Sequence, residues 1–86
     1  MASYSIEFKM SAAKEVRKIK DRETKRRLLN RIKRLSEEPR PPGCVKLTES
    51  EHYRIRVGSF RIVYQIVDEV LVVIVVRVAH QREVYR

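Results

Sequence analysis

The sequence has few of the residues that build covalent cross-links or metal centres. Its single cysteine, Cys44, cannot form an internal disulfide. Its two histidines, His52 and His80, are far apart in the chain and, with one cysteine, do not form a zinc-binding pattern. The chain contains two glycines and no glycine-rich phosphate loop. We therefore expect neither a metal nor a small-molecule cofactor.

Long apolar runs are also missing. The longest one, residues 70–76, is far too short to cross a bilayer. The N-terminus has no basic stretch followed by an apolar run, so no signal peptide is predicted. Together with the lone thiol, these features predict a cytoplasmic protein without a membrane partner. A length of 86 residues corresponds to one domain, residues 1–86.

Positive charge is in excess. The chain has 20 Lys and Arg residues against 11 Asp and Glu residues, and this net charge of +9 favours polyanionic partners such as nucleic acid. Residues 1–43 carry thirteen basic and six acidic side chains, whereas residues 44–86 carry seven and five. In the second half, a functional arginine must therefore be identified by its position.

The first half predicts one strand and then two helices in a hairpin, although one bent helix would also fit. Residues 4–8 alternate apolar and polar side chains, as in a half-buried strand. Ser11 is a candidate N-cap for a first helix, and Asp21 for a second one. The apolar stripes of these helices would be Ala12, Ala13, Val16 and Ile19, and Leu28, Leu29, Ile32 and Leu35. The prolines and glycine of residues 39–43 end the helical part.

The second half predicts β-structure. The candidate strands are residues 45–47, 53–57, 60–67 and 70–79, and the last is apolar enough to be buried on both faces. Gly58-Ser59 and Asp68-Glu69 are the candidate two-residue turns. We therefore predict an α+β fold: an N-terminal strand, a two-helix hairpin and then an antiparallel β-sheet, with the helices packed on one sheet face.

Strand alternation predicts where the arginines point. A two-residue turn at Gly58-Ser59 pairs Arg56 with Arg61 and places Arg54 on the same face, away from the apolar face. Opposed like charges destabilise a sheet, and an anion bridging the guanidinium groups would reverse this effect. A two-residue turn at residues 68–69 would add His80 to the arginine face, although a slip of one residue would move it to the other face.

Residues 53–64, Tyr-Arg-Ile-Arg-Val-Gly-Ser-Phe-Arg-Ile-Val-Tyr, resemble the central motif of the RelE/ParE toxin superfamily. Residues 42–47 and the ending Val-Ala-His-Gln-Arg-Glu-Val-Tyr at 78–85 are similar to the same family. The resemblance implies a toxin of a type II toxin–antitoxin pair, held inactive by a RelB-like antitoxin. RelE-type members enter the ribosomal A site and cleave mRNA there. The family's active-site positions correspond here to Arg54, Arg56, Arg61, Arg82 and Tyr85.

Cleavage of RNA by attack of the 2′-hydroxyl needs a base, an acid and positive charge at the phosphate. Arginine cannot be deprotonated in proteins, so the arginines would hold the phosphate and stabilise the developing charge. His80 or Tyr85 would transfer the proton, and Tyr85 could instead stack on a base. We predict ribosome and RNA binding by a basic helix face, made up of Lys25, Arg26, Arg27, Arg31, Lys33 and Arg34.

Two other functions fit the same sequence. One is a ParE-type toxin of the same fold, which poisons DNA gyrase without cleaving RNA. The retained arginines and the terminal tyrosine argue against it, because such members tend to lose those residues. The other is a nucleic-acid-binding module without catalytic activity, which would bind RNA and form no 2′,3′-cyclic phosphate product.

Overall fold

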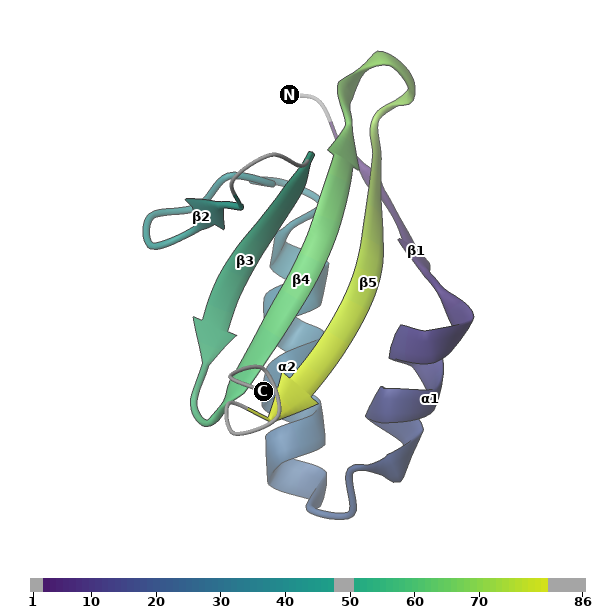
Figure 1. Cartoon of the computed structure of the whole chain (residues 1–86), viewed down its shortest axis with the longest axis vertical. Coiled ribbons are helices and arrows are strands. Elements are labelled where there is room, and N and C mark those ends of the chain that lie inside the picture. Colours follow the sequence, from purple (N-terminus) through teal and green to yellow (C-terminus); the bar gives the residue numbers. More distant parts are fainter. Residues whose placement is uncertain (1–2, 48–50, 81–86) are drawn as a thin grey trace.

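A five-stranded sheet and two helices make up the described part of the chain. The structure is a computed structural model that describes residues 3–47 and 51–80. Its elements are β1 (Ser5–Phe8), α1 (Met10–Lys18), α2 (Arg22–Arg34), β2 (Val45–Lys46), β3 (His52–Val57), β4 (Phe60–Val67), a 3-10 turn (Asp68–Val70) and β5 (Val72–His80). This order confirms the predicted α+β class with a two-helix hairpin. Figure 1 shows the curved sheet with the helices behind and beside it.

The sheet is antiparallel except at one edge. Its strand order is β1-β5-β4-β3-β2, and β1 pairs with β5 in parallel, with Ser5 opposite Val72 and Phe8 opposite Val75. The first strand of the chain is thus the neighbour of the last one. Parallel pairing needs a crossover between the two strands, and here the helices and the β2–β3–β4 segment supply it.

The helices begin and end for local reasons. The Asp21 side chain accepts a hydrogen bond from the backbone N–H of Thr24 (3.2 Å) and so caps α2, as predicted. The prediction for Ser11 is wrong, because α1 begins one residue earlier, at Met10, and Lys9 is its uncapped N-cap residue. The Ser11 hydroxyl donates instead to the carbonyl oxygen of Val76 in β5 (3.1 Å).

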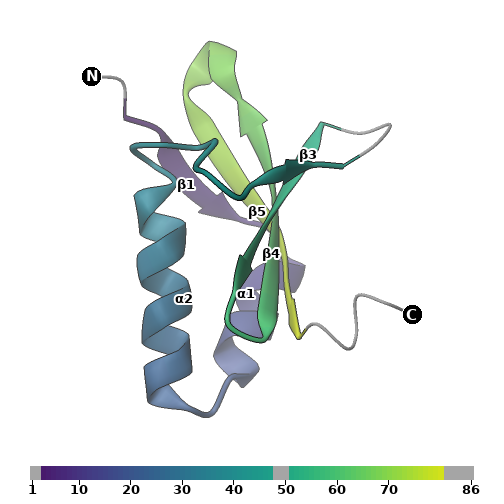
Figure 2. The same ribbon diagram turned by 90° about the vertical axis from the view of Figure 1, so that its left-hand side faces the viewer.

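The core lies between the helices and one face of the sheet. Ala12 and Val16 of α1 and Leu28 and Ile32 of α2 are buried, whereas Leu29 is exposed because it lies outside the apolar stripe of α2. The buried residues of the loop and sheet are Leu35, Ile55, Val57, Ile62, Tyr64, Ile66, Val73, Val75 and Val78. Figure 2 shows α2 along this inner face, and we call the opposite face the outer face.

The hairpin of β3 and β4 has the predicted register. Val57 is opposite Phe60, and Arg56 is opposite Arg61. Gly58 has a φ of 59°, a left-handed conformation that favours glycine in the turn. The sequence was sufficient here because a two-residue turn determines the pairing of every residue along both strands.

The pairing of β4 with β5 differs from the prediction. The connection contains four residues, 68–71, instead of the predicted two, so Val67 is opposite Val72. Relative to the predicted pairing, each partner in β5 shifts by an even number of residues, so this change alone leaves every side chain on its predicted face. Further along, Tyr64 is opposite Val75 and Val63 is opposite Arg77, so that Val76 is an extra residue in β5. This β-bulge inverts the faces of all residues after it. The prediction that this strand is buried on both faces is also wrong, because Val72, Ile74 and Val76 are only partly buried and Arg77 is exposed.

Side chains of α1 replace a neighbouring strand along the end of β5. The last pairing of β1 is that of Phe8 with Val75, and α1 lies beside β5 from there on (Figure 1). Besides the bond from Ser11 to Val76, Glu15 accepts a hydrogen bond from the backbone N–H of Val78 (2.7 Å) through Oε1. Oε2 of Glu15 accepts from Nε and Nη2 of Arg77 (3.0 and 2.9 Å). Glu15 therefore holds both residues that follow the bulge.

Replacing Glu15 tests this arrangement. We expect Glu15→Ala to lower the free energy of unfolding by about 1–3 kcal/mol, because the partly buried N–H of Val78 loses its acceptor. Glu15→Gln is the matched control, since its amide oxygen can still accept that bond and only the ion pair is lost. Urea denaturation measures both. Equal destabilisation by the two variants would show that the ion pair, and not the bond to the strand, is what matters.

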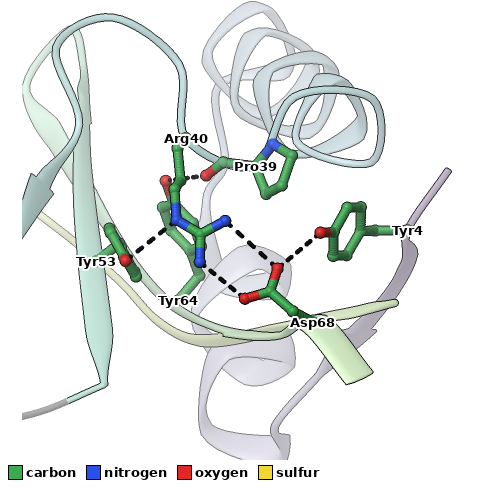
Figure 3. Close-up of polar contacts among 6 residues, drawn as sticks. All are labelled: Tyr4, Pro39, Arg40, Tyr53, Tyr64 and Asp68. Carbon is green, nitrogen blue, oxygen red and sulfur yellow. Dashed lines mark hydrogen bonds and ion pairs between the residues drawn. The ribbon is translucent and has the colours of Figure 1, made fainter. Parts of the chain in front are cut away.

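At the opposite end of the sheet, polar side chains join five segments (Figure 3). Asp68 accepts hydrogen bonds from the Tyr4 hydroxyl (2.7 Å) and from Nη2 of Arg40 (2.9 Å). Nε of Arg40 donates to the Tyr53 hydroxyl (3.2 Å), and Tyr53 stacks on Tyr64 at a centroid distance of 6.0 Å. The Tyr64 hydroxyl, in turn, donates to the carbonyl oxygen of Pro39 (2.7 Å). These contacts fix the loop after α2 against the sheet.

This cluster makes stability depend on pH. The hydrogen bonds from Arg40 and Tyr4 lower the pKa of Asp68. A carboxyl with a lowered pKa in the folded state stabilises the fold above its unfolded pKa of about 3.9 and loses this effect as the pH falls through the folded value. We therefore expect Asp68→Asn to be less stable than the wild type at pH 7, with a difference that shrinks toward about pH 3.

Urea midpoints at several pH values measure this difference. Glu69→Gln is the control, because it removes the same charge from an exposed neighbouring residue outside the cluster. A difference between wild type and Asp68→Asn that stays constant down to pH 3 would contradict the assignment of the effect to the Asp68 carboxylate.

Candidate nucleic-acid interface

The outer face carries the arginines that the sequence predicted for it. Arg54 and Arg56 of β3 and Arg61 of β4 lie on this face, as the hairpin register confirms. Within residues 3–47 and 51–80, no hydrogen bond or ion pair involves the side chain of Arg54 or Arg56. Both groups can therefore bind an anion without first breaking a contact.

Arg61 differs from its neighbours in burial. It is 2% exposed, and Ala79, its partner in β5 on the same face, is also 2% exposed. Arg56, the partner of Arg61 in β3 on the same face, is exposed. A buried guanidinium has lost most of its hydration and is held in place, so Arg61 is a fixed charge whereas Arg56 can adjust to a ligand.

His80 does not join the arginines. The bulge at Val76 places it opposite Phe60, on the inner side of the sheet, and the two rings meet edge to face at a centroid distance of 5.4 Å. The prediction that His80 shares the arginine face is therefore wrong. The cause is the single extra residue in β5, since the longer turn alone would have kept His80 on the predicted side.

Arg82 and Tyr85, the other two predicted site residues, lie outside the described residues. The sequence missed Arg77, which the bulge turns to the outer face opposite Val63, in line with Arg54 across the sheet. Arg77 is the only residue of the Lys, Arg, Asp and Glu types among the nine residues of β5. This isolation in an apolar strand was the signal that could have identified it.

The basic residues of α2 come from the helix that lies along the inner face of the sheet (Figure 2). Arg26, Arg27, Lys33 and Arg34 are exposed, and Lys25 and Arg31 are partly buried. Arg26 forms an ion pair with Glu23 one turn earlier. The helix set and the strand arginines therefore come from different layers of the fold, although Arg27 lines a small pocket together with Gly58 and Ser59 of the β3–β4 turn.

The described residues contain no group of three or more His, Cys, Asp or Glu side chains that could hold a metal ion. In the same part of the chain, no helix is long and apolar enough to cross a membrane.

The three predicted arginines of the outer face supply positive charge, and none of them can lose its proton to act as a base. Such a surface can orient a phosphate and stabilise a dianionic phosphorane, but it cannot itself accept a proton.

Comparison with known proteins agrees with this fold. Residues 6–85 match the family described as the ParE toxin of the type II toxin–antitoxin system parDE. The chain therefore belongs to this toxin family, within the RelE/ParE superfamily. It is 31% identical over 77 residues to a RelE-like toxin protein of Escherichia coli, an alignment that covers 87% of this chain and 80% of that protein.

Solved toxin structures have the same fold. The toxin–antitoxin complex RelBE2 of Mycobacterium tuberculosis contains a chain that matches with a TM-score of 0.83, 25% identity and coverage of 93% of both chains. The isolated RelE toxin of E. coli matches with a TM-score of 0.81 and 32% identity, covering 96% of this chain and 92% of that chain. The intact E. coli RelBE complex contains a chain that matches with a TM-score of 0.80 and 30% identity, covering 91% of this chain and 96% of that chain.

The opposed pair Arg56 and Arg61 should weaken the fold while no anion is bound. We expect Arg56→Gln to raise the free energy of unfolding by about 0.2–0.5 kcal/mol, because it removes the like charge opposite Arg61. The gain should disappear in about 1 M NaCl, where the screening length is about 3 Å. Urea denaturation at low and high salt measures it, with Arg17→Gln as a charge-matched control on exposed α1. Lower stability of Arg56→Gln at low salt would contradict the repulsion.

Proposed function

We propose that this toxin is a metal-independent endoribonuclease that cleaves mRNA in the ribosomal A site and thereby inhibits translation. The observation that supports it most is the placement of Arg56 opposite Arg61, with Arg54 on the same outer face. Stability alone disfavours this placement, since opposed like charges repel across a strand pair. A phosphodiester that bridges these side chains would offset the repulsion by attracting both guanidinium groups.

The arginines supply electrostatic stabilisation in this proposal. Arg54 and Arg56 bind the non-bridging oxygens of the scissile phosphate, and Arg61 contributes a fixed positive charge beside them. The 2′-hydroxyl loses its proton to a base as its oxygen attacks the phosphorus, the bond to the 5′-oxygen breaks, and that oxygen takes up a proton from water. A 2′,3′-cyclic phosphate and a 5′-hydroxyl result. Planar guanidinium forks fit the equatorial oxygens of the phosphorane, so their interaction strengthens in the transition state.

Tyr85 is the proton-transfer group that we favour. His80 was the alternative, and its position opposite Phe60 on the inner side of the sheet argues against it. Positive charge around a tyrosine hydroxyl favours the phenolate and lowers the pKa, which makes this group a better base near neutral pH. Arg82 completes the predicted charge around the phosphate.

The partners follow from the same assignment. The basic residues of α2 bind ribosomal RNA through salt-sensitive, sequence-independent contacts. A RelB-like antitoxin holds the toxin inactive in this proposal. The support is that the M. tuberculosis and E. coli relatives were solved as toxin–antitoxin complexes. Action on ribosomes places the protein in the cytoplasm.

A ParE-type inhibitor of DNA gyrase is the second candidate. The family match carries the ParE description, whereas the E. coli protein and structures above are of the RelE type. The arginines retained on the outer face favour the nuclease. A module that binds RNA without cleaving it shares the arginines but needs no proton-transfer group.

Cleavage of mRNA on purified ribosomes tests the proposal. We expect Arg61→Ala to reduce the cleavage rate by about 10²–10³-fold through lost charge stabilisation, and Tyr85→Phe by about 10²–10⁴-fold through lost proton transfer. Primer extension maps the cuts, and Arg17→Ala is the control on the exposed face of α1.

Unchanged cleavage by both Arg61→Ala and Tyr85→Phe would exclude this site. Wild-type protein that leaves ribosome-bound mRNA intact and causes gyrase-dependent DNA breakage would instead establish the second candidate. Salt-sensitive RNA binding without a cyclic phosphate product would indicate the non-catalytic module.

A further inference from the structure

Arg77 extends the basic surface beyond the three arginines predicted from the sequence. It lies opposite Val63, which is opposite Arg54, so these residues form one row across β5, β4 and β3 on the outer face. Neighbouring strands are about 4.8 Å apart, which places the Arg54 and Arg77 backbones about 10 Å from each other. Two long side chains at this separation can contact one bound strand at different phosphates.

The contact with Glu15 holds the Arg77 side chain without hiding it. Nε and Nη2 donate to the same carboxylate oxygen, and the other oxygen is bonded to the N–H of Val78. The Arg77 side chain is still 50% exposed, against 22% for Glu15. A guanidinium has five N–H donors, so three remain for a ligand after these two bonds.

Stabilisation of β5 does not account for an arginine at this position. Glu15 is already bound to the strand through Val78, and a half-exposed ion pair contributes little to stability. Arg54, Arg56 and Arg61 repel one another on the same face, where Glu15 offsets only the charge of Arg77 and, among the described residues, no acidic side chain pairs with Arg54 or Arg56. A bound polyanion would turn this repulsion into attraction.

We propose that Arg77, oriented by Glu15, binds a backbone phosphate of the substrate RNA next to the one held by Arg54 and Arg56. The RNA strand then crosses the outer face from β3 to β5, and Arg77 is a binding residue that takes no part in bond cleavage. This inference rests on the proposed function, because it assumes that the outer face receives single-stranded RNA.

The salt dependence of RNA binding tests the proposal. The probe is a short fluorescent single-stranded RNA with 2′-O-methyl groups, which cannot be cleaved by 2′-hydroxyl attack. Each phosphate contact to a single strand contributes about 0.7 to the slope of log affinity against log salt. We expect Arg77→Gln to lower the slope by about 0.7 and to weaken binding about tenfold at low salt, because one charge-assisted contact is lost.

Two further variants separate this role from general charge and from folding. Arg77→Lys keeps the charge and the pairing with Glu15, and should keep the wild-type slope. Arg17→Gln removes one positive charge from exposed α1, away from the outer face, and should also keep it. Unchanged melting temperatures show that the variants are folded.

A wild-type slope for Arg77→Gln, or an equal loss of slope for Arg17→Gln, would overturn the proposal, as would absence of RNA binding by the wild-type protein. The cleavage assay on ribosomes decides the proposed function separately. Cleavage that requires Arg61 and Tyr85, together with an unchanged slope for Arg77→Gln, would refute only the role of Arg77.

Discussion

One extra residue in β5 determines which side chains meet on the outer face. Val75 and Val78 are both buried although three positions separate them, and regular alternation would place them on opposite faces. The bulge at Val76 resolves this conflict: it keeps both valines in the core and turns Arg77 outward. Glu15 and Ser11 hold the strand here because β1 has ended and the edge of β5 would otherwise carry unpaired backbone groups.

The outer face carries charges whose placement lowers the stability of the fold. Arg56 and Arg61 repel each other across the hairpin, and burial of Arg61 adds the cost of removing a charge from water. A small domain has little stability to lose, so these costs need compensation elsewhere. The apolar layer between the helices and the sheet provides it, together with the hydrogen bonds from α1 to the edge of β5.

Two groups of charged side chains on the sheet differ in their pairing. In one, Asp68 accepts hydrogen bonds from Arg40 and Tyr4 and so ties the loop after α2 and the 3-10 turn to the sheet. In the other, on the outer face, Arg54 and Arg56 carry charge that no acidic group offsets among the described residues. Paired charges rigidify the scaffold, and the unpaired ones leave binding energy for an anionic ligand.

The sequence by itself determined the class of fold, the capped second helix and the arginine face of the hairpin. All of these depend on local rules: helical periodicity, the side chain of Asp21 and the two-residue turn at Gly58, which sets the register of Arg56 against Arg61. The parallel pairing of β1 with β5, the inner position of His80 and the outer position of Arg77 depended on the tertiary structure. The apolar residues before Arg77 do not reveal where the bulge lies, and it forms where the core and the helix beside the strand edge require it.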